Sequence, residues 1–224
     1  MAALAVGLAS AAPTVSRAAD CGTSPEAGLD WSECSKNNLM LEHSDLKGAN
    51  LAGTNLSVTG LSDSNLDGAH LEKANLTRAW FTGSSMKKAD LDRVLAYRSG
   101  FAKVTADGST FASAELQRAN FAGAHLTGVD FQKAELGRAN FEKAVVTGAN
   151  FKLANLSRAN FSGVTFEAPM NFDRAFMFLT NIAGLDLSNA KGLLQPQIDL
   201  ACGDDKTKLP QGLNKPSDWP CGAD

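Results

Sequence analysis

A strict five-residue repeat constrains this chain more than any other feature. From Leu41 to Phe166, every fifth position belongs to one column of 26 residues, of which 13 are Leu and nine are Phe. The position two residues earlier holds Ala, Ser, Thr or Val in 25 of the 26 repeats, with Leu39 as the exception. Because a helix needs apolar residues at alternating spacings of three and four, a constant spacing of five predicts an all-β coil instead.

The repeat also predicts where the chain turns. Residues two apart in an extended segment point to the same side, so the small and the large residue of each repeat face inward together. The next inward pair arrives only five residues later, and the chain must turn between them. Glycines gather two residues after the large residue, where a turn with positive φ favours them. They are Gly48, Gly53, Gly68, Gly83, Gly108, Gly123, Gly128, Gly148 and Gly163.

Outward positions indicate how many repeats complete one circuit. Five arginines recur every 20 residues: Arg78, Arg98, Arg118, Arg138 and Arg158. Four repeats per circuit is the simplest arrangement that places like residues above one another. We then expect one inner face to stack Phe101, Phe121, Phe141 and Phe161, and the opposite face to stack Phe111, Phe131 and Phe151, with Leu116, Leu136 and Leu156 lining a face between them.

The register slips once, near the C-terminal end. After Phe166 the large residues fall one position late, at Phe172, Met177, Ile182 and Leu187. Pro169 lies at the slip, which predicts a one-residue bulge near residues 168–171. With these four repeats the total is 30, or about 7.5 coils, and a spacing of about 4.8 Å per coil gives a rod of about 36 Å.

The repeat unit resembles that of the pentapeptide-repeat family, A(D/N)LXX. The matching segments include Ala49-Asn50-Leu51, Ala74-Asn75-Leu76, Ala119-Asn120-Phe121 and Ala159-Asn160-Phe161. The resemblance covers residues 39–190 and implies a right-handed, four-sided parallel β-helix. The flanks resemble an exported bacterial subgroup of that family with cysteine-bracketed ends.

The ends of the chain predict export and capping. Residues 1–18 are interpreted as a signal peptide, with an apolar run and a small-x-small site before Ala19; an Ala-rich tail is the alternative. We therefore expect a periplasmic or secreted protein. Residues 19–38 would form an N-terminal cap plugged by Trp31. Residues 191–224 would form a C-terminal cap with a short helix near Gln195–Cys202, ended by Gly203.

The four cysteines lie outside the repeat, two on each side. An even count at the ends of an exported chain suggests disulfides, and locality favours Cys21–Cys34 and Cys202–Cys221 among three connectivities. A metal site is the alternative, but no CxxC pair is present and the three histidines are scattered at His43, His70 and His125. We therefore expect no bound metal and no cofactor.

The arginine column is the first candidate binding feature. Stacked guanidiniums would start from Cα atoms about 5 Å apart and repel one another, unless anions lie between them. Glu115 and Glu135 precede Arg118 and Arg138 by three residues and could neutralise them. The column is interpreted as a stripe for an anionic partner, with a solvated column fixed only by coil geometry as the alternative.

Two aromatic residues form a second candidate. Trp80 is outward, with Gly60 and Gly100 one coil below and above, so its ring is expected to lie across both glycines. Together with Tyr97, Arg78 and Arg98, it would form an aromatic-basic patch. Packing compensation for Ala96 and Ala106, which replace large residues nearby, is the alternative.

The sequence shows no catalytic motif, such as a phosphate loop, a nucleophile elbow or clustered His and carboxylates. We therefore expect a non-catalytic binding or structural module without a small-molecule substrate or transmembrane segment, either a monomer or a weak dimer. Its partner would be a protein or an anionic envelope component. The resemblance implies one alternative, because some members of the family mimic DNA and protect a type II topoisomerase. Such mimicry needs an acidic rod, whereas 15 basic and 15 acidic residues lie between Glu42 and Asp186, and this balance also argues against nucleic acid as partner.

Overall fold

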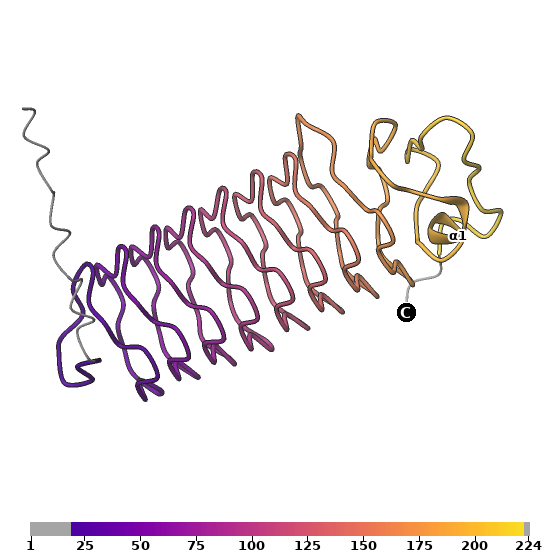
Figure 1. Ribbon diagram of the computed structural model, residues 1–224. Coiled ribbons are helices and arrows are strands. Elements are labelled where there is room, and N and C mark those ends of the chain that lie inside the picture. The colour runs from indigo at the N-terminus through magenta and orange to yellow at the C-terminus, as the bar shows by residue number, and fades with distance from the viewer. Residues whose placement is uncertain (1–18, 222–224) are drawn as a thin grey trace, which may run out of the picture.

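The fold is known from a computed structural model that describes residues 19–221. The predicted signal peptide, residues 1–18, lies outside the described residues, as do residues 222–224. The chain winds into successive coils stacked along one axis, with a short helix at the far end (Figure 1). Single parallel bridges join neighbouring coils from Asp30↔Asn50 to Asp186↔Lys208, and most link residues 20 apart. Four repeats therefore complete one circuit, as the outward columns predict.

Backbone hydrogen bonds tie each coil to both of its neighbours. Phe121 N–H donates to Asn140 O in the next coil at 2.7 Å, and Asn120 N–H donates to Ser99 O in the preceding coil at 2.9 Å. The same pair of bonds recurs at nearly every repeat, and it pairs the backbone groups that extended segments this short would otherwise leave exposed.

The turn after each inward pair has the predicted conformation. All nine glycines named above have φ between 62° and 75°. From His43 to Arg158, the non-glycine residues at this place in the repeat adopt the same left-handed conformation; the arginine column, for example, has φ between 57° and 61°. The coil therefore imposes this backbone conformation on long side chains, which normally avoid it.

The asparagines of the repeat support the turns and the stacking. Asn140 Oδ1 accepts a hydrogen bond from Glu142 N–H at 3.1 Å, two residues later. Asn160 Nδ2 donates to Asn140 Oδ1 from the following coil at 3.0 Å. One side chain thus satisfies a turn donor and joins a ladder along the rod.

The core confirms the predicted stacks. Ring centroids lie 5.0, 5.1 and 4.8 Å apart along Phe101, Phe121, Phe141 and Phe161. On the opposite face both steps along Phe111, Phe131 and Phe151 are 5.3 Å. Rings of the two stacks meet edge to face, for instance Phe121 and Phe131 at 5.6 Å. All seven rings are fully buried, as are the leucines of the face between them.

The register slip also lies where the sequence predicts it. Bridges that cross Pro169 join residues 21 apart, as in Asn150↔Asn171 and Asn155↔Phe176. One additional residue is therefore accommodated, and the ladder then continues.

The N-terminal end begins to pair earlier than the predicted boundary at residue 39. Bridges already involve Asp30 and Ser35, so part of the predicted cap is the first coil. Trp31 is buried, and its Nε1 donates to Thr23 Oγ1 at 3.0 Å. Cys21 and Cys34 form a disulfide that fastens the segment before this coil.

The C-terminal end is closed by α1, Gln195–Ile198. This helix is shorter than the predicted Gln195–Cys202, because Cys202 returns to the ladder and bridges Asn181. Gln197 Nε2 donates to Phe172 O at 2.8 Å and Ala175 O at 3.0 Å, which satisfies carbonyls of a late coil. Ladder bridges extend to Lys208, past the predicted limit at residue 190.

A tail segment completes this end. Cys221 is linked to Cys202 by the second disulfide. Trp219 Nε1 donates to Ala201 O at 2.7 Å, and the indole lies against Gly203, where any Cβ would come within 2.3 Å of the ring. Within residues 19–221, no helix has the length and apolar character needed to cross a membrane.

Candidate functional site

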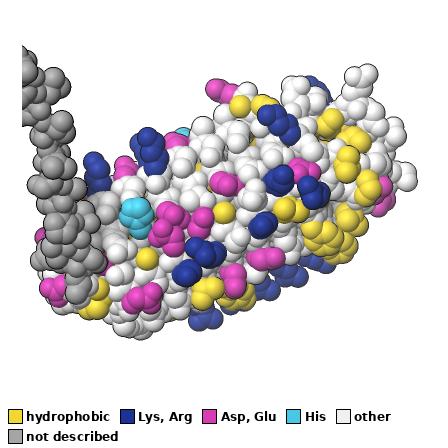
Figure 2. Space-filling model, viewed as in Figure 1, with side chains coloured by type: hydrophobic (Ala, Val, Ile, Leu, Met, Phe, Trp, Pro, Cys, Tyr) yellow, Lys and Arg dark blue, Asp and Glu magenta, His cyan; other side chains and the backbone are white. Residues whose placement is uncertain are grey.

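The arginine column occupies one corner of the rod. Its five members share the same turn position in successive coils, and all five side chains are exposed. Backbone bonds fix their alignment: Arg118 N–H donates to Gly137 O at 2.9 Å, and Arg138 N–H donates to Ser157 O at 2.8 Å. In the view of Figure 2, basic side chains gather along the lower edge of the rod. The coil geometry therefore presents a row of cations in fixed register.

A shallow depression runs beside the column. Its lining residues are Gln117, Arg118, Gly137, Arg138, Ser157 and Arg158. Gly137 has no side chain and Ser157 a short one, so the arginines stand above a floor of small and polar groups. A partner could reach both the guanidinium groups and this floor.

Aromatic side chains lie at both ends of the depression. Tyr97, 38% exposed, lies with its ring centroid 5.2 Å from the Arg98 guanidinium carbon. At the other end Phe176 and Phe178 stack at 6.4 Å with 49% and 41% exposure, and Arg158 lies 6.0 Å over Phe178. The sequence-based prediction did not include this pair, because the register slip hides the alignment of Phe178 with Ser157. An offset of 21 residues beyond Pro169 would have shown it.

The expected neutralisation of the column by glutamates is not observed. Ion pairs among residues 19–221 include neither Glu115 with Arg118 nor Glu135 with Arg138. Glu135 Oε2 instead accepts a hydrogen bond from Asn155 Nδ2 at 2.8 Å. These two glutamates therefore leave the positive charge of the two arginines available.

Trp80 lies mainly over one of its two glycines. It bridges both Gly60 and Gly100, but a Cβ on Gly60 would come within 2.8 Å of the indole Nε1, whereas one on Gly100 would meet Trp80 Cβ and Cα, at 3.4 and 3.7 Å, and no atom of the ring. The half-buried indole is thus directed toward the preceding coil. Ring contacts in the described part of the chain do not join Trp80 to Tyr97, so the structure associates Tyr97 with the arginine column and leaves Trp80 apart.

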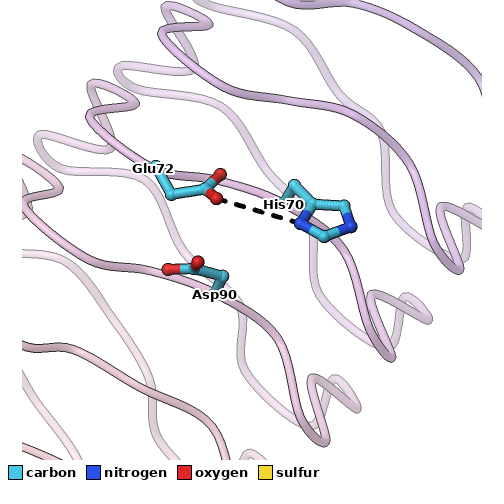
Figure 3. Close-up of side chains that lie close together, drawn as sticks. All are labelled: His70, Glu72 and Asp90. Carbon is cyan, nitrogen blue, oxygen red and sulfur yellow. Dashed lines mark ion pairs between the residues drawn. The ribbon is translucent and has the colours of Figure 1, made fainter.

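A separate cluster combines a histidine with two carboxylates (Figure 3). His70 and Glu72 flank the buried Leu71, so both point outward from one coil, and Asp90 bridges His70 from the next coil. Their nearest ligand atoms all lie within 4.8 Å of one another, and His70 Nδ1 is 3.9 Å from Glu72 Oε1. Burial raises the pKa of the Asp90 carboxyl and the adjacent Glu72 adds to the increase, while the Asp92 N–H opposes it.

The surroundings of this cluster are mixed in charge. His70 and Glu72 line a depression together with Glu33, Lys73 and Arg93. The three histidines were expected to be scattered, and this grouping with carboxylates was not predicted. A register of 20 combined with the alternation of an extended segment would have placed residues 70, 72 and 90 side by side.

Comparison with known proteins was informative at the level of family and fold. The family described as Pentapeptide repeats (8 copies) matches residues 61–95, 107–142 and 134–168. Among solved structures, a trypsin-treated variant of QnrB1, a plasmid-mediated fluoroquinolone resistance protein, has a TM-score of 0.56 at 19% identity, over 83% of this chain and 92% of its own. HetL of the cyanobacterium Nostoc sp. strain PCC 7120, involved in heterocyst differentiation regulation, has a TM-score of 0.47 at 22% identity, over 88% and 91%. Among curated proteins, none matches.

Proposed function

Because this chain belongs to the pentapeptide-repeat family, we propose that it is a non-catalytic binding module of the bacterial periplasm or cell exterior, which recognises an acidic protein surface through its arginine column. The observation that carries the proposal is the exposed row of arginines beside a shallow polar floor. Such a surface suits recognition rather than catalysis, since enzyme sites are concave pockets with a few convergent polar groups.

The electrostatics of the column favour an anionic partner. Guanidiniums on neighbouring coils repel by roughly 1 kcal/mol per adjacent pair even in water-like surroundings. A carboxylate inserted between two of them removes this repulsion and accepts charge-assisted hydrogen bonds, which the planar guanidinium can donate in pairs. Arg118 and Arg138, which Glu115 and Glu135 do not neutralise, are the best placed to gain.

The aromatic ends of the depression favour a protein over a simple polyanion. Tyr97 and Phe178 lie four coils apart, about 19 Å along the rod at the usual spacing of paired segments. Aromatic residues and arginine are the side chains that most often dominate binding energy in protein interfaces. A folded partner with an acidic centre flanked by apolar groups would contact both the arginine column and the aromatic residues at its two ends.

The proposed location is supported by the cysteines and the leader-like start of the sequence. The two disulfides lie at the two ends of the ladder, and disulfides persist in oxidising compartments. Intact mass measured on separated periplasmic and cytoplasmic fractions tests this. We expect a periplasmic species starting near Ala19, lighter than its reduced form by four hydrogens. An uncleaved cytoplasmic species with free thiols would contradict the proposal and direct the next test to topoisomerase protection.

The binding face itself is tested by site-specific crosslinking in the envelope. A photoreactive residue at Gln117, on the floor of the depression, should crosslink one discrete partner. Arg118→Glu with Arg138→Glu should abolish the adduct. The matched control is Lys103→Glu with Lys143→Glu, which reverses two charges at the same turn position on another corner. A crosslink that survives the arginine reversals, or is lost equally in the control, would refute the arginine column as the recognition surface.

A further inference from the structure

We propose that His70, Glu72 and Asp90 bind a divalent transition-metal cation of the Zn²⁺ class, on a face of the rod distinct from the arginine column. This site goes beyond the proposed recognition function and does not depend on it. One imidazole and two carboxylates converge there from two adjacent coils (Figure 3).

The backbone holds the three side chains in place. His70 N–H donates to Ala49 O and Asp90 N–H donates to Ala69 O, both at 2.9 Å, while Leu71 N–H donates to Asp90 O at 2.7 Å. Leu71 is fully buried, which directs the residues on either side of it outward. His70 and Asp90 therefore stand on the ladder, and Glu72 lies in the tight turn directly after it, an arrangement that favours a preorganised metal site.

The distances are close to those of a bound cation. Ligand atoms about 2.1 Å from a tetrahedral Zn²⁺ lie roughly 3.4 Å apart. Here the His70 Nδ1–Glu72 Oε1 distance is 3.9 Å, and all three ligand atoms lie within 4.8 Å. Side-chain rotations that close the cluster by about an ångström would bring the three ligand atoms to coordination distance without moving the backbone.

Charge and ligand chemistry identify the class of cation. A neutral imidazole with two carboxylates carries two negative charges, which a divalent ion balances. The carboxylates of Glu72 and Asp90 face one another and repel, and a cation between them removes that repulsion. The nitrogen ligand favours Zn²⁺ and its neighbours over Ca²⁺ or Mg²⁺, which prefer oxygen. Three protein ligands leave a coordination position open to solvent, since His70 is exposed.

Outer contacts orient part of the site. Asp92 N–H donates to Asp90 Oδ1 at 3.0 Å, which fixes that carboxylate and leaves its other oxygen for a ligand bond. Lys73, Arg93 and Glu33 line the adjoining depression, where the two cations offset part of the negative field. We therefore expect micromolar rather than nanomolar affinity.

Calorimetric titration of the disulfide-intact full chain with ZnCl₂ tests the site. We expect one equivalent to bind, and His70→Gln, Glu72→Gln and Asp90→Asn each to weaken binding at least tenfold. These substitutions keep the side-chain size similar and leave the backbone bonds intact, which circular dichroism would verify. His125→Gln is the matched control, because this histidine is also exposed on the ladder but bridges Thr105 and Val145.

A second measurement distinguishes a histidine that binds the metal from one that does not. On addition of Zn²⁺, the imidazole ¹⁵N resonances of His70 should shift at Nδ1 while those of His125 stay in place. The proposal is overturned by the absence of Zn²⁺ binding, by equal binding in the three variants, or by an equal loss in His125→Gln. Binding of Ca²⁺ as tightly as Zn²⁺, with no effect of His70→Gln, would also overturn it.

Discussion

The coils of residues 41–80 and those of residues 101–172 share one backbone pattern but fill it differently. The first region, here the leucine half, buries leucines in the large column from Leu46 to Leu76. The second, the phenylalanine half, buries two stacks of rings that meet edge to face. Bridges with the same spacing of 20 run through both until the slip. The register of the coils thus depends on the size and the apolar character of the side chains that point inward. Whether the large column holds leucine or phenylalanine is free to change.

The weakest part of the repeat lies at the transition between the halves. Ala96 and Ala106 are fully buried on the two faces that adjoin Phe101. Phe101 stacks on Phe81 at 5.1 Å and meets Phe111 at 5.7 Å. Phe121 makes ring contacts of similar length although the buried Leu116 and Leu126 flank it, so the ring contacts alone do not explain the two alanines.

Removing one phenylalanine ring should give the largest loss of stability among the variants that compare the two halves. Phe121 contacts four other rings at 5.0 to 5.8 Å. Phe121→Ala should cost about 4 kcal/mol of unfolding free energy, and Leu66→Ala in the leucine half about 3 kcal/mol. Phe121→Leu should cost about 1.5 kcal/mol, since the same coil already accommodates leucine elsewhere. Denaturant unfolding measures all three. If Phe121→Leu were as costly as Phe121→Ala, the two fillings would not be interchangeable.

Removing the C-terminal disulfide should destabilise the terminal coils and leave the phenylalanine half unaffected. The Cys202–Cys221 disulfide closes a segment of 19 residues. Replacing both cysteines with serine should cost about 3 kcal/mol by the chain-entropy argument. Hydrogen exchange should then show faster opening near Asn181 and Lys208, while amides near Phe121 and Phe141 stay protected. Faster exchange in the central coils first would contradict a cap that acts locally.

Relieving backbone strain should give a smaller effect of opposite sign. Val58 in the leucine half has φ of 56° and is 39% exposed, and Leu153 in the phenylalanine half has φ of 59° and is 37% exposed. Asparagine tolerates this conformation better, so Val58→Asn should stabilise by about 1 kcal/mol. Leu153→Asn should gain less, because Leu is not β-branched. Thermal unfolding of the pair would show whether strain or side-chain burial dominates; destabilisation by Val58→Asn would indicate burial.

The smallest expected effect is a pH dependence confined to the C-terminal end. Hydrogen bonds from Lys208 and Ser188 lower the pKa of Asp186 to about 2. A lowered folded-state pKa contributes stability above the ordinary value, which is lost as pH falls from about 4 to about 2. Amide exchange near Lys208 should therefore accelerate across that window, and Asp186→Asn should reduce the dependence to the part contributed by Asp204, whose pKa is also lowered by hydrogen bonds from Gly184 and Thr207. An unchanged pH profile in Asp186→Asn would assign it to another carboxyl.

The interior of the rod could be predicted from the sequence far better than its outer surface. Repeat period, turn glycines, phenylalanine stacks and the slip near Pro169 all follow from inward size and backbone sterics, which are local and strict. The helix end at Ile198 was not predictable, since the return of Cys202 to the ladder depends on Asn181 in another coil. Outer clusters such as His70 with Asp90 require the register first and then the side-chain positions. Their functional roles depend on ligands, and ligand binding produces no periodic pattern in the sequence from which it could be predicted.

Coil stacking has one further consequence for the arginine face. Each circuit of 20 residues advances the chain by one step of about 4.8 Å and returns it to the same corner. The distance between Tyr97 and Phe178 along the rod can therefore change only in whole coil steps. Deleting residues 112–131 would shorten it by one step and leave both disulfides in place. A protein built this way is a molecular ruler, whose reach changes by insertion or loss of whole turns rather than by bending.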